Sequence, residues 1–260
     1  MTIPDTTLTT GLLVLARVAG LVLAAPLFGH LLVPPRVRVG LAALLAVALA
    51  PAVVAATPLP AVPANLWELG GMVGVESAIG VLLGVVAQFL FAGVQLGGQL
   101  AGMQMGFGLS NLIDPSSHAH TTVVAQWQQL MALLVFLVLD VHHLLIRALL
   151  SSFTTAPPGT LALAALDVRG AVALAADIFT VAVRIAAPVL VALLLTNGAL
   201  GVLARTIPQL NVFVVGFPVN AGVGLLVLGA SLPFTFRLLM ARFGALAPTL
   251  GGLVRGLAHG

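Results

Sequence analysis

The sequence predicts an all-α, polytopic membrane protein with about six long apolar helical segments. Of its 260 residues, 60% are hydrophobic and only 7% are charged, whereas about 25% of the residues of a soluble domain are charged. Long apolar stretches alternate with short breaks that contain proline, and the period-two alternation of transmembrane β-strands is absent. So few charges cannot cover a soluble domain, and an apolar chain of this kind is not disordered.

Six apolar blocks follow one another, and most reach the ~20 residues that a helix needs to cross a bilayer. Proline separates them because it removes a backbone donor and restricts the residue before it. We expect the first block to be retained, since the residues before it include Asp5 and no Lys or Arg, whereas a secretory signal begins with positive charge. The blocks are Gly11–Val33, Val39–Ala56, Leu69–Leu96, Val123–Leu150, Ala171–Leu203 and Val212–Leu239.

The arginines are placed unusually for six simple crossings. With six simple crossings, eight arginines would be divided between the two sides of the membrane. This goes against the tendency of positive charge to stay on one side. One extra pass or re-entrant turn between Leu82 and Asp114 would bring seven of the eight together. Either the third block is a broken or doubled helix, or the protein is not an ordinary membrane bundle. The eight are Arg36, Arg38, Arg147, Arg169, Arg205, Arg237, Arg242 and Arg255.

Polar side chains interrupt the blocks, and an ionisable group in lipid normally faces a partner or a water-filled cavity. Two interpretations stay open: hydrogen bonding within one bundle, or contact with other subunits or a pore. Glu76 is expected to be ionised and paired with an arginine, which a neighbouring subunit could supply. The polar residues concerned are Arg17, Glu76, Gln88, Gln95, Asp140, His142, His143, Arg184, Asn197 and Asn220.

Glycines recur at spacing four through the third block and beyond it, from Gly70 and Gly74 to Gly102 and Gly106. Small residues at this spacing let another helix approach closely. Gln88, Gln95 and Gln99 fall on one helical face beside them. The stretch is either a tightly packed core helix or a contact face for other helices.

A candidate plug follows this stretch, in which flexible methionines, a Phe between two glycines and an Asp-Pro stop lie together. Methionine fills irregular gaps and yields easily, and glycine lets the backbone bend. The alternative is a hydrophobic loop packed on its own bundle. The candidate plug residues are Met103, Met105, Gly106, Phe107, Gly108, Leu109, Asp114 and Pro115.

Enzymatic and metal-binding motifs are missing. Cysteine and lysine are both absent, which excludes thiolate zinc sites, Schiff-base lysines and phosphate-binding P-loops. His142 and His143 are adjacent, so on a helix they would point ~100° apart and could not share one ion. Asp140, His143 and Arg147 share a face and are expected to form a structural cluster. We expect no metal, no cofactor and no catalysis, and no basic run suits a nucleic acid.

Several stretches, in order along nearly the whole chain, resemble the FliR family of flagellar export-gate proteins, whose injectisome counterpart is the T component of type III secretion. The run from Pro208 to Pro218 favours the flagellar branch, and Val141 departs from the glycine that many members have there. The matching stretches are Arg17–Gly20, Pro26–Gly29, Pro34–Arg38, Glu76, Gln95–Pro115, His142-His143, Ser152-Phe153, Pro157–Gly159, Pro188–Asn197 and Arg205–Pro218.

The resemblance implies a structural subunit that assembles with FliP and FliQ homologues into a helical gate of the bacterial inner membrane, at the centre of the flagellar basal body. FlhB would wrap this gate, FlhA would lie beneath it, and exported flagellar subunits would pass through. Residues 1–165 would resemble FliP and residues 166–260 FliQ, as helical hairpins, with the family's plug loop at about Phe107 to Thr122. Polar contacts between subunits would involve Arg17, Glu76, Gln95, Asp140, His143, Arg205 and Asn211.

A carrier for ions or small solutes is the alternative, with Glu76, Asp140 and His143 as a proton path. A carrier of this kind typically contains inverted repeats with matching broken helices. No convincing internal repeat is present in the sequence. The export-gate interpretation is therefore favoured.

Overall fold

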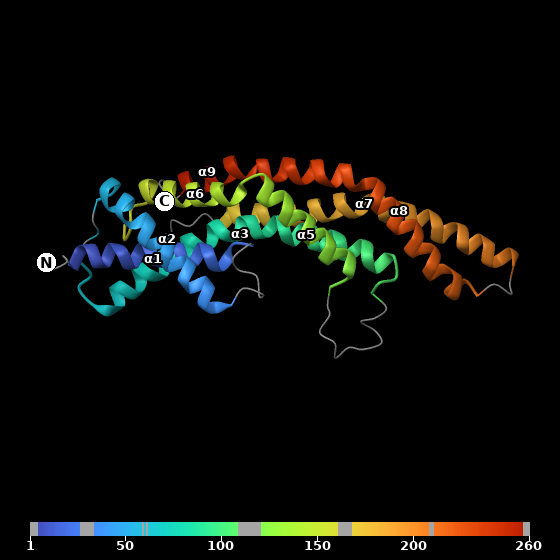
Figure 1. Cartoon of the computed structure of the whole chain (residues 1–260), viewed down its shortest axis with the longest axis horizontal. Coiled ribbons are helices and arrows are strands. Elements are labelled where there is room, and N and C mark those ends of the chain that lie inside the picture. Colours follow the sequence, from blue (N-terminus) through green and yellow to red (C-terminus); the bar gives the residue numbers. More distant parts are fainter. Residues whose placement is uncertain are drawn as a thin grey trace. The chain divides into compact units, whose positions relative to one another are not determined.

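A computed structural model describes residues 5–26, 34–58, 60, 62–108, 121–160, 168–207 and 211–256 of the chain. Within these residues all regular structure is helical, which confirms the predicted all-α fold (Figure 1). The helices are α1 (Asp5–Ala24), α2 (Pro35–Ala56), α3 (Leu66–Gln104), α5 (Val123–Val138), α6 (Val141–Thr155), α7 (Val168–Thr206), α8 (Val212–Gly244) and α9 (Leu246–Gly256).

The chain divides into two compact units. The first unit comprises residues 1–89, 137–174 and 243–260, so it contains α1, α2, α6, α9 and the first part of α3. The second unit comprises residues 90–136 and 175–242, so it contains the end of α3, α5 and most of α7 and α8. Both units are therefore assembled from segments far apart in sequence.

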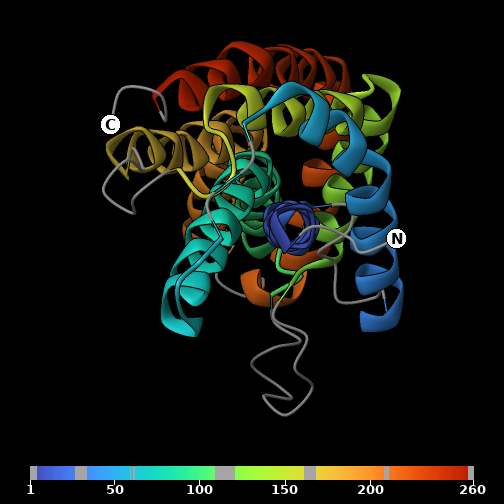
Figure 2. The same cartoon turned by 90° about the vertical axis from the view of Figure 1, so that its left-hand side faces the viewer.

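In the first unit, α1 packs against α2 and against the first part of α3, and α6 packs against α9 and α2. Figure 2 shows α1 end-on, beside α3. A side chain added at Gly20 would collide with the backbone of Ser77 on α3, and one added at Gly80 would collide with the carbonyl of Arg17 on α1. Glycine at these positions permits the close helix contact that the spacing of small residues predicts.

α3 is one unbroken helix of 39 residues, about 58 Å long at 1.5 Å per residue. The broken helix considered from the arginine pattern is therefore wrong between Leu66 and Gln104. Glycine weakens an isolated helix, but the glycines of α3 from Gly80 onward lie against other elements. Gly93 and Gly97 contact Val181 and Ile185 of α7 in the second unit. Packing against neighbours replaces the intrinsic stability that a glycine-rich helix lacks.

The fourth apolar block is not one straight helix but a pair, α5 and α6, bent by 62°. Asp140 sits at the bend in the left-handed region, with φ 52°, and its backbone N–H donates to the Leu137 carbonyl at 3.1 Å. Aspartate tolerates this conformation better than a branched apolar residue does. The periodicity of apolar residues continues across the bend, so the sequence did not reveal it.

The remaining segments agree with a polytopic membrane protein. Within the described residues, five helices are long and apolar enough to cross a bilayer, or up to six if the bent α5–α6 pair is one span. The sixth block extends to Gly244 and is followed by α9, a short helix that was not predicted. α9 packs on α6 in the first unit.

Replacing Gly80 with alanine is expected to destabilise the protein, whereas the same change at Gly74 is not. A Cβ at Gly80 would lie 2.9 Å from Leu21 N and closer still to the Arg17 carbonyl, and backbone atoms cannot yield cheaply. Overpacking of this kind costs about 1–3 kcal/mol. Gly74 has nothing within 4 Å of an added Cβ, so alanine there should gain helix propensity of about 1 kcal/mol. Thermal unfolding of both variants in detergent tests this, and equal midpoints would contradict the α1–α3 contact.

Candidate functional site

The end of α3, at the centre of the candidate plug, is closed by a glycine cap. Phe107 N–H donates to the Gly102 carbonyl and Gly106 N–H to the Met103 carbonyl, both at 3.0 Å. Gly106 itself is left-handed, with φ 94°. This pair of bonds around a left-handed glycine is the Schellman motif that satisfies the last carbonyls of a helix. The helix therefore ends at Gln104, earlier than the expected stop at Asp114 and Pro115.

The Met105 side chain is fixed in the apolar core and does not form an exposed, flexible surface. It is fully buried and belongs to an apolar cluster that joins α3, α5, α7 and α8 in the second unit. An added Cβ at Gly224 of α8 would lie 2.5 Å from Met105 Cγ, so glycine there makes room for the methionine. Met103, by contrast, is 48% exposed. The cluster comprises Ala101, Met105, Val124, Val189, Leu193 and Leu228, with Phe107, Trp127, Val223 and Val227 packed against it.

Phe107 and Gly106 both meet Phe217 of α8. The two phenyl rings are edge-to-face, with centroids 6.4 Å apart and planes at 83°, a favourable arrangement for aromatic pairs. Phe217 Cδ2 lies 2.6 Å from where a Cβ of Gly106 would be. Sequence reasoning missed Phe217, whose only signal was its place in the Gly-Phe-Pro run quoted for the family resemblance.

The first turn of α5 is tied to the last turns of α3. Thr122 N–H donates to Gln99 Oε1 at 2.8 Å, and the Thr122 hydroxyl accepts from Ala125 N–H as the cap of α5. An added Cβ on Gly102 would collide with the same hydroxyl. The two ends of the intervening segment are therefore held by fixed helix termini. Leu109, Asp114 and Pro115, the remaining candidate plug residues, lie outside the described residues.

A buried ion pair joins three segments of the first unit. Arg17 Nε lies 2.6 Å from Glu76 Oε2, with the two side chains 0% and 1% exposed. Arg17 also donates to the Ser152 hydroxyl and to the Ala156 carbonyl, both at 3.0 Å. Glu76 Oε1 accepts from Gly159 N–H at 3.0 Å. We call these five residues the Arg17–Glu76 network.

Phe153 completes the surroundings of this network. The Arg17 guanidinium carbon lies 4.3 Å from the centroid of the Phe153 ring, within reach of a cation–π contact. Glu76 thus has the arginine partner that was expected, and that arginine belongs to the same chain. Arg17 and Glu76 are fully enclosed within the single chain, and the expected contacts of these two residues between subunits stay a prediction.

The other polar residues predicted at subunit contacts lie elsewhere and do not form one site. Gln95 is half-buried on α3, whereas Arg205 and Asn211 are exposed near the end of α7 and the start of α8. Asn211 Oδ1 caps α8 by accepting from Val214 N–H at 3.3 Å. In the second unit, Asn220 of α8 donates to Asn197 Oδ1 of α7 at 2.9 Å, which links these two helices.

Asp140, His142 and His143 lie together at the bend between α5 and α6. His143 Nδ1 is 3.2 Å from Asp140 Oδ1, and both side chains are exposed. The two imidazole rings are only 4.1 Å apart, and the three residues offer ligand atoms within 4.8 Å of one another. The expectation that the adjacent histidines diverge is therefore wrong, because side-chain torsions bring the rings together despite the helical spacing of their Cα atoms.

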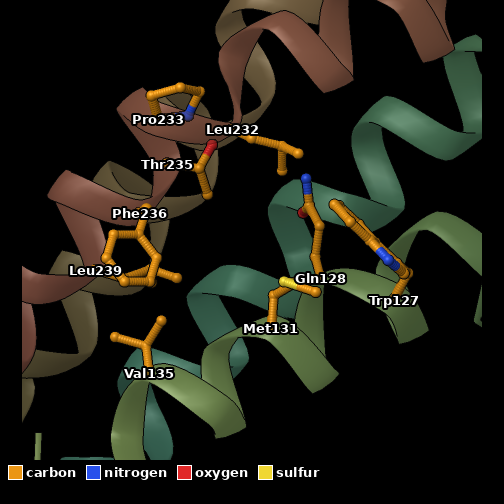
Figure 3. A pocket seen from close by; sticks show the side chains of 9 residues that line it. All are labelled: Trp127, Gln128, Met131, Val135, Leu232, Pro233, Thr235, Phe236 and Leu239. Carbon is orange, nitrogen blue, oxygen red and sulfur yellow. The ribbon is translucent and has the colours of Figure 1, made fainter. Parts of the chain in front are cut away.

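An apolar pocket of about 320 Å³ lies between α5 and α8 in the second unit (Figure 3). Two of its lining residues are polar and buried: Gln128 is 2% exposed and Thr235 is 8% exposed. The Gln128 carboxamide oxygen has no hydrogen-bond partner within the described part of the chain. No sequence signal pointed to this pocket. It is lined by Trp127, Gln128, Met131, Val135, Leu232, Pro233, Thr235, Phe236 and Leu239.

Comparison with known proteins identifies relatives over nearly the whole chain. The pattern of the family described as "Bacterial export proteins, family 1" matches residues 8–246. The flagellar biosynthetic protein FliR of Escherichia coli (strain K12) is 36% identical over 224 residues, covering 84% of this chain and 82% of that protein. The FliR protein of Bacillus subtilis (strain 168) is 33% identical over 246 residues, covering 94% and 93%. That of Aquifex aeolicus (strain VF5) is 29% identical over 227 residues, covering 87% and 86%.

Proposed function

We propose a specific role for this chain from the premise that it belongs to bacterial export proteins, family 1, the family of the flagellar biosynthetic protein FliR. It is a membrane protein of flagellar biosynthesis. The proposed role is that of a structural, non-enzymatic subunit of the flagellar protein export gate in the bacterial inner membrane. With FliP and FliQ homologues it would form the channel through which flagellar subunits leave the cell, with FlhB and FlhA bound to it at the basal body.

The observation that carries this proposal is the apolar surface that the single chain leaves uncovered. The apolar windows of α2, α7 and α8 are only 17%, 33% and 22% buried. The span in α7 has 32 residues and the one that begins in α8 has 41, whereas about 20 residues cross a bilayer. Lipid alone cannot cover such lengths, so protein partners with apolar helices suit the remaining surface.

The arrangement of Glu76 speaks against the rival carrier. A proton path needs a carboxylate whose oxygens can exchange protons with water or with the next group. Both oxygens of Glu76 accept hydrogen bonds inside the Arg17–Glu76 network, and the side chain is 1% exposed. Glu76 therefore fits a structural role better than a role in proton transfer.

The proposed division into a FliP-like part, residues 1–165, and a FliQ-like part, residues 166–260, remains a prediction. Its support is local: α7 and α8 are consecutive long helices joined near residue 211, and Asn197 and Asn220 link them. A hairpin of this kind is the expected form of the second part. When residues 1–165 and residues 166–260 are expressed together as two separate chains, the two chains should associate into a complex.

Coexpression tests the main proposal. The chain should form a stable complex with FliP and FliQ homologues from the same organism and be poorly behaved alone, because its exposed apolar helices lack partners. Size-exclusion chromatography in mild detergent, with subunits identified by mass, provides the measurement. A well-folded monomer that ignores both partners would contradict the export-gate role.

The candidate plug gives a further prediction for the assembled complex. We propose that the plug loop at about Phe107 to Thr122 closes the channel, with the capped end of α3 and the start of α5 as the fixed anchors. Replacing Leu109 to His120 by a short Gly/Ser linker should leave assembly intact and raise uptake of a small probe into cells. Unchanged uptake with a fully assembled complex would show that the segment is ordinary packing.

A further inference from the structure

The carboxylate of Asp140 and the imidazoles of His142 and His143 converge at the start of α6. Asp140 Oδ1 lies 3.2 Å from His143 Nδ1 and 4.0 Å from His142 Nε2. The three residues offer ligand atoms that all lie within 4.8 Å of one another. All three belong to the first unit, so their arrangement does not depend on the second.

The backbone around Asp140 holds these side chains on a fixed turn. The carbonyl oxygen of the left-handed Asp140 accepts from the N–H groups of His143 at 3.0 Å and Leu144 at 3.3 Å. Val141, between the ligand-bearing residues, is 3% exposed and fixes the first turn of α6 on the core. Nδ1 of His142 is buried, so Nε2 is the ring nitrogen that faces Asp140. The cluster is therefore built on an ordered helix start.

The Asp140 carboxylate does not cap α6, although the residue occupies the capping position. An aspartate there normally accepts from a backbone N–H of the first helical turn, but Asp140 makes no such side-chain hydrogen bond. Arg147, which was expected to join Asp140 and His143 in a structural cluster, makes no ion pair with Asp140 within the described part of the chain. The carboxylate is instead directed at the two imidazoles. Together these groups offer one negative charge and two ring nitrogens to a cation.

We propose that Asp140, His142 and His143 bind a divalent transition-metal ion, of which zinc is the representative. Imidazole nitrogens with a carboxylate oxygen suit such ions, whereas Mg²⁺ and Ca²⁺ prefer oxygen ligands alone. With bonds of about 2.0–2.2 Å, the ligand atoms of a tetrahedral zinc lie roughly 3.3–3.6 Å apart. The separations of 3.2 and 4.0 Å from Asp140 Oδ1 are close to this range, and rotation of the exposed His143 side chain adjusts the third.

The ion would be held by His142 Nε2, His143 Nδ1 and one oxygen of Asp140, with water in the remaining position. It replaces the proton between His143 Nδ1 and Asp140 Oδ1, which moves to the other ring nitrogen or to water. The expectation of no metal rested on diverging histidines, whereas their ring centroids are only 4.1 Å apart. The site does not depend on the export-gate role.

Zinc binding by the full chain tests the proposal. The chain is purified in detergent with an affinity tag other than polyhistidine, because such a tag would itself bind zinc. It is equilibrated with excess Zn²⁺, dialysed against metal-free buffer and analysed for zinc, and its affinity is measured by competition with a chromophoric chelator. We expect a single zinc ion per chain, which excess Mg²⁺ does not displace.

Variants assign the bound zinc to this cluster. Asp140→Asn removes the charge and keeps a residue that tolerates the left-handed backbone. It should weaken binding by at least the ~10–100-fold that loss of a second-shell partner costs. His142→Gln/His143→Gln should abolish binding, together with the visible absorption of Co²⁺ used in place of zinc. The matched control, His118→Gln/His120→Gln, removes another close pair of the six histidines and should bind zinc normally.

Equal zinc content in the wild type and in His142→Gln/His143→Gln would overturn the proposal, and so would the absence of retained zinc from both. Circular dichroism verifies that the variants are folded, as expected from side chains of Asp140 and His143 that are 70% and 61% exposed. If the chain alone aggregates, the same pair of proteins is compared in the complex with FliP and FliQ homologues. Failure of that complex to form would count against the proposed function, whereas the zinc content of the chain alone decides the metal site.

Discussion

Replacing Glu76 with alanine is expected to deplete folded protein strongly and to prevent its assembly with FliP and FliQ homologues. The variant leaves the Arg17 guanidinium fully buried and without its counter-charge. Removing one partner of a buried ion pair typically costs about 3–5 kcal/mol, which is a large part of the ~5–15 kcal/mol that stabilises a typical protein. The measurements are the thermal unfolding midpoint in detergent and the yield of complex, with motility as the cellular readout.

Two control variants distinguish charge from packing. Glu68→Ala removes an exposed carboxylate on the same helix, which accepts from the nearby Ala64 N–H, and should change stability little. The double variant Arg17→Met/Glu76→Leu replaces the pair by apolar side chains and should recover much of the lost stability, as apolar replacements of buried pairs often do. Normal assembly and motility of Glu76→Ala would show that the ion pair has no structural role.

Gly106→Val is expected to abolish or strongly reduce export while the seal against small molecules holds. The left-handed φ of 94° is closed to a β-branched residue, at a cost of about 1–2 kcal/mol. The new side chain would also meet Phe217, 2.6 Å from its Cβ, and such overpacking costs about 1–3 kcal/mol. Secretion of a flagellar subunit, measured together with uptake of a small probe, gives the result.

Gly108→Val is the matched control two residues further on. Its nearest neighbour would be Met103 Cγ at 3.3 Å, a flexible side chain that can move aside. It should therefore export nearly normally. Gly106→Val/Phe217→Ala removes the collision and leaves the backbone strain, so it should recover only part of the loss. Equal export by the two glycine variants would rule out the cap as a functional element.

The fold was predictable because apolar length alone specifies membrane helices. Each of the six blocks corresponds to a helix or to the bent pair α5–α6. The glycines of α3 from Gly80 onward lie at close contacts with α1, α7 and the start of α5. The bend at Asp140 was not predictable, since the apolar pattern runs through it. Nor was the end of α3, because several glycines between residues 97 and 108 could each have ended the helix. Only the left-handed turn at Gly106 distinguishes them.

The contacts of the site depended on partners distant in sequence. An arginine partner for Glu76 was expected from the cost of an unpaired charge in apolar surroundings, yet nothing local selects Arg17 among the ten arginines. Phe217 meets Gly106 and Phe107 only because α8 folds back on the end of α3 in the second unit. The pocket likewise exists only where α5 and α8 meet. Such pairings are tertiary and leave no periodic trace in the sequence.

The Arg17–Glu76 network also has a consequence for the order of events during synthesis. Arg17 leaves the ribosome 59 residues before Glu76 and 139 residues before Ala156. At ~5–20 residues per second, this arginine waits about 3–12 s for its counter-ion and about 7–28 s for its last acceptor. An uncompensated arginine at the bilayer centre costs about 2.5–3.5 kcal/mol even on insertion scales. The nascent α1 is therefore expected to stay in the insertion machinery or at the membrane surface until α3 emerges, so that its insertion is coupled to that of a later helix.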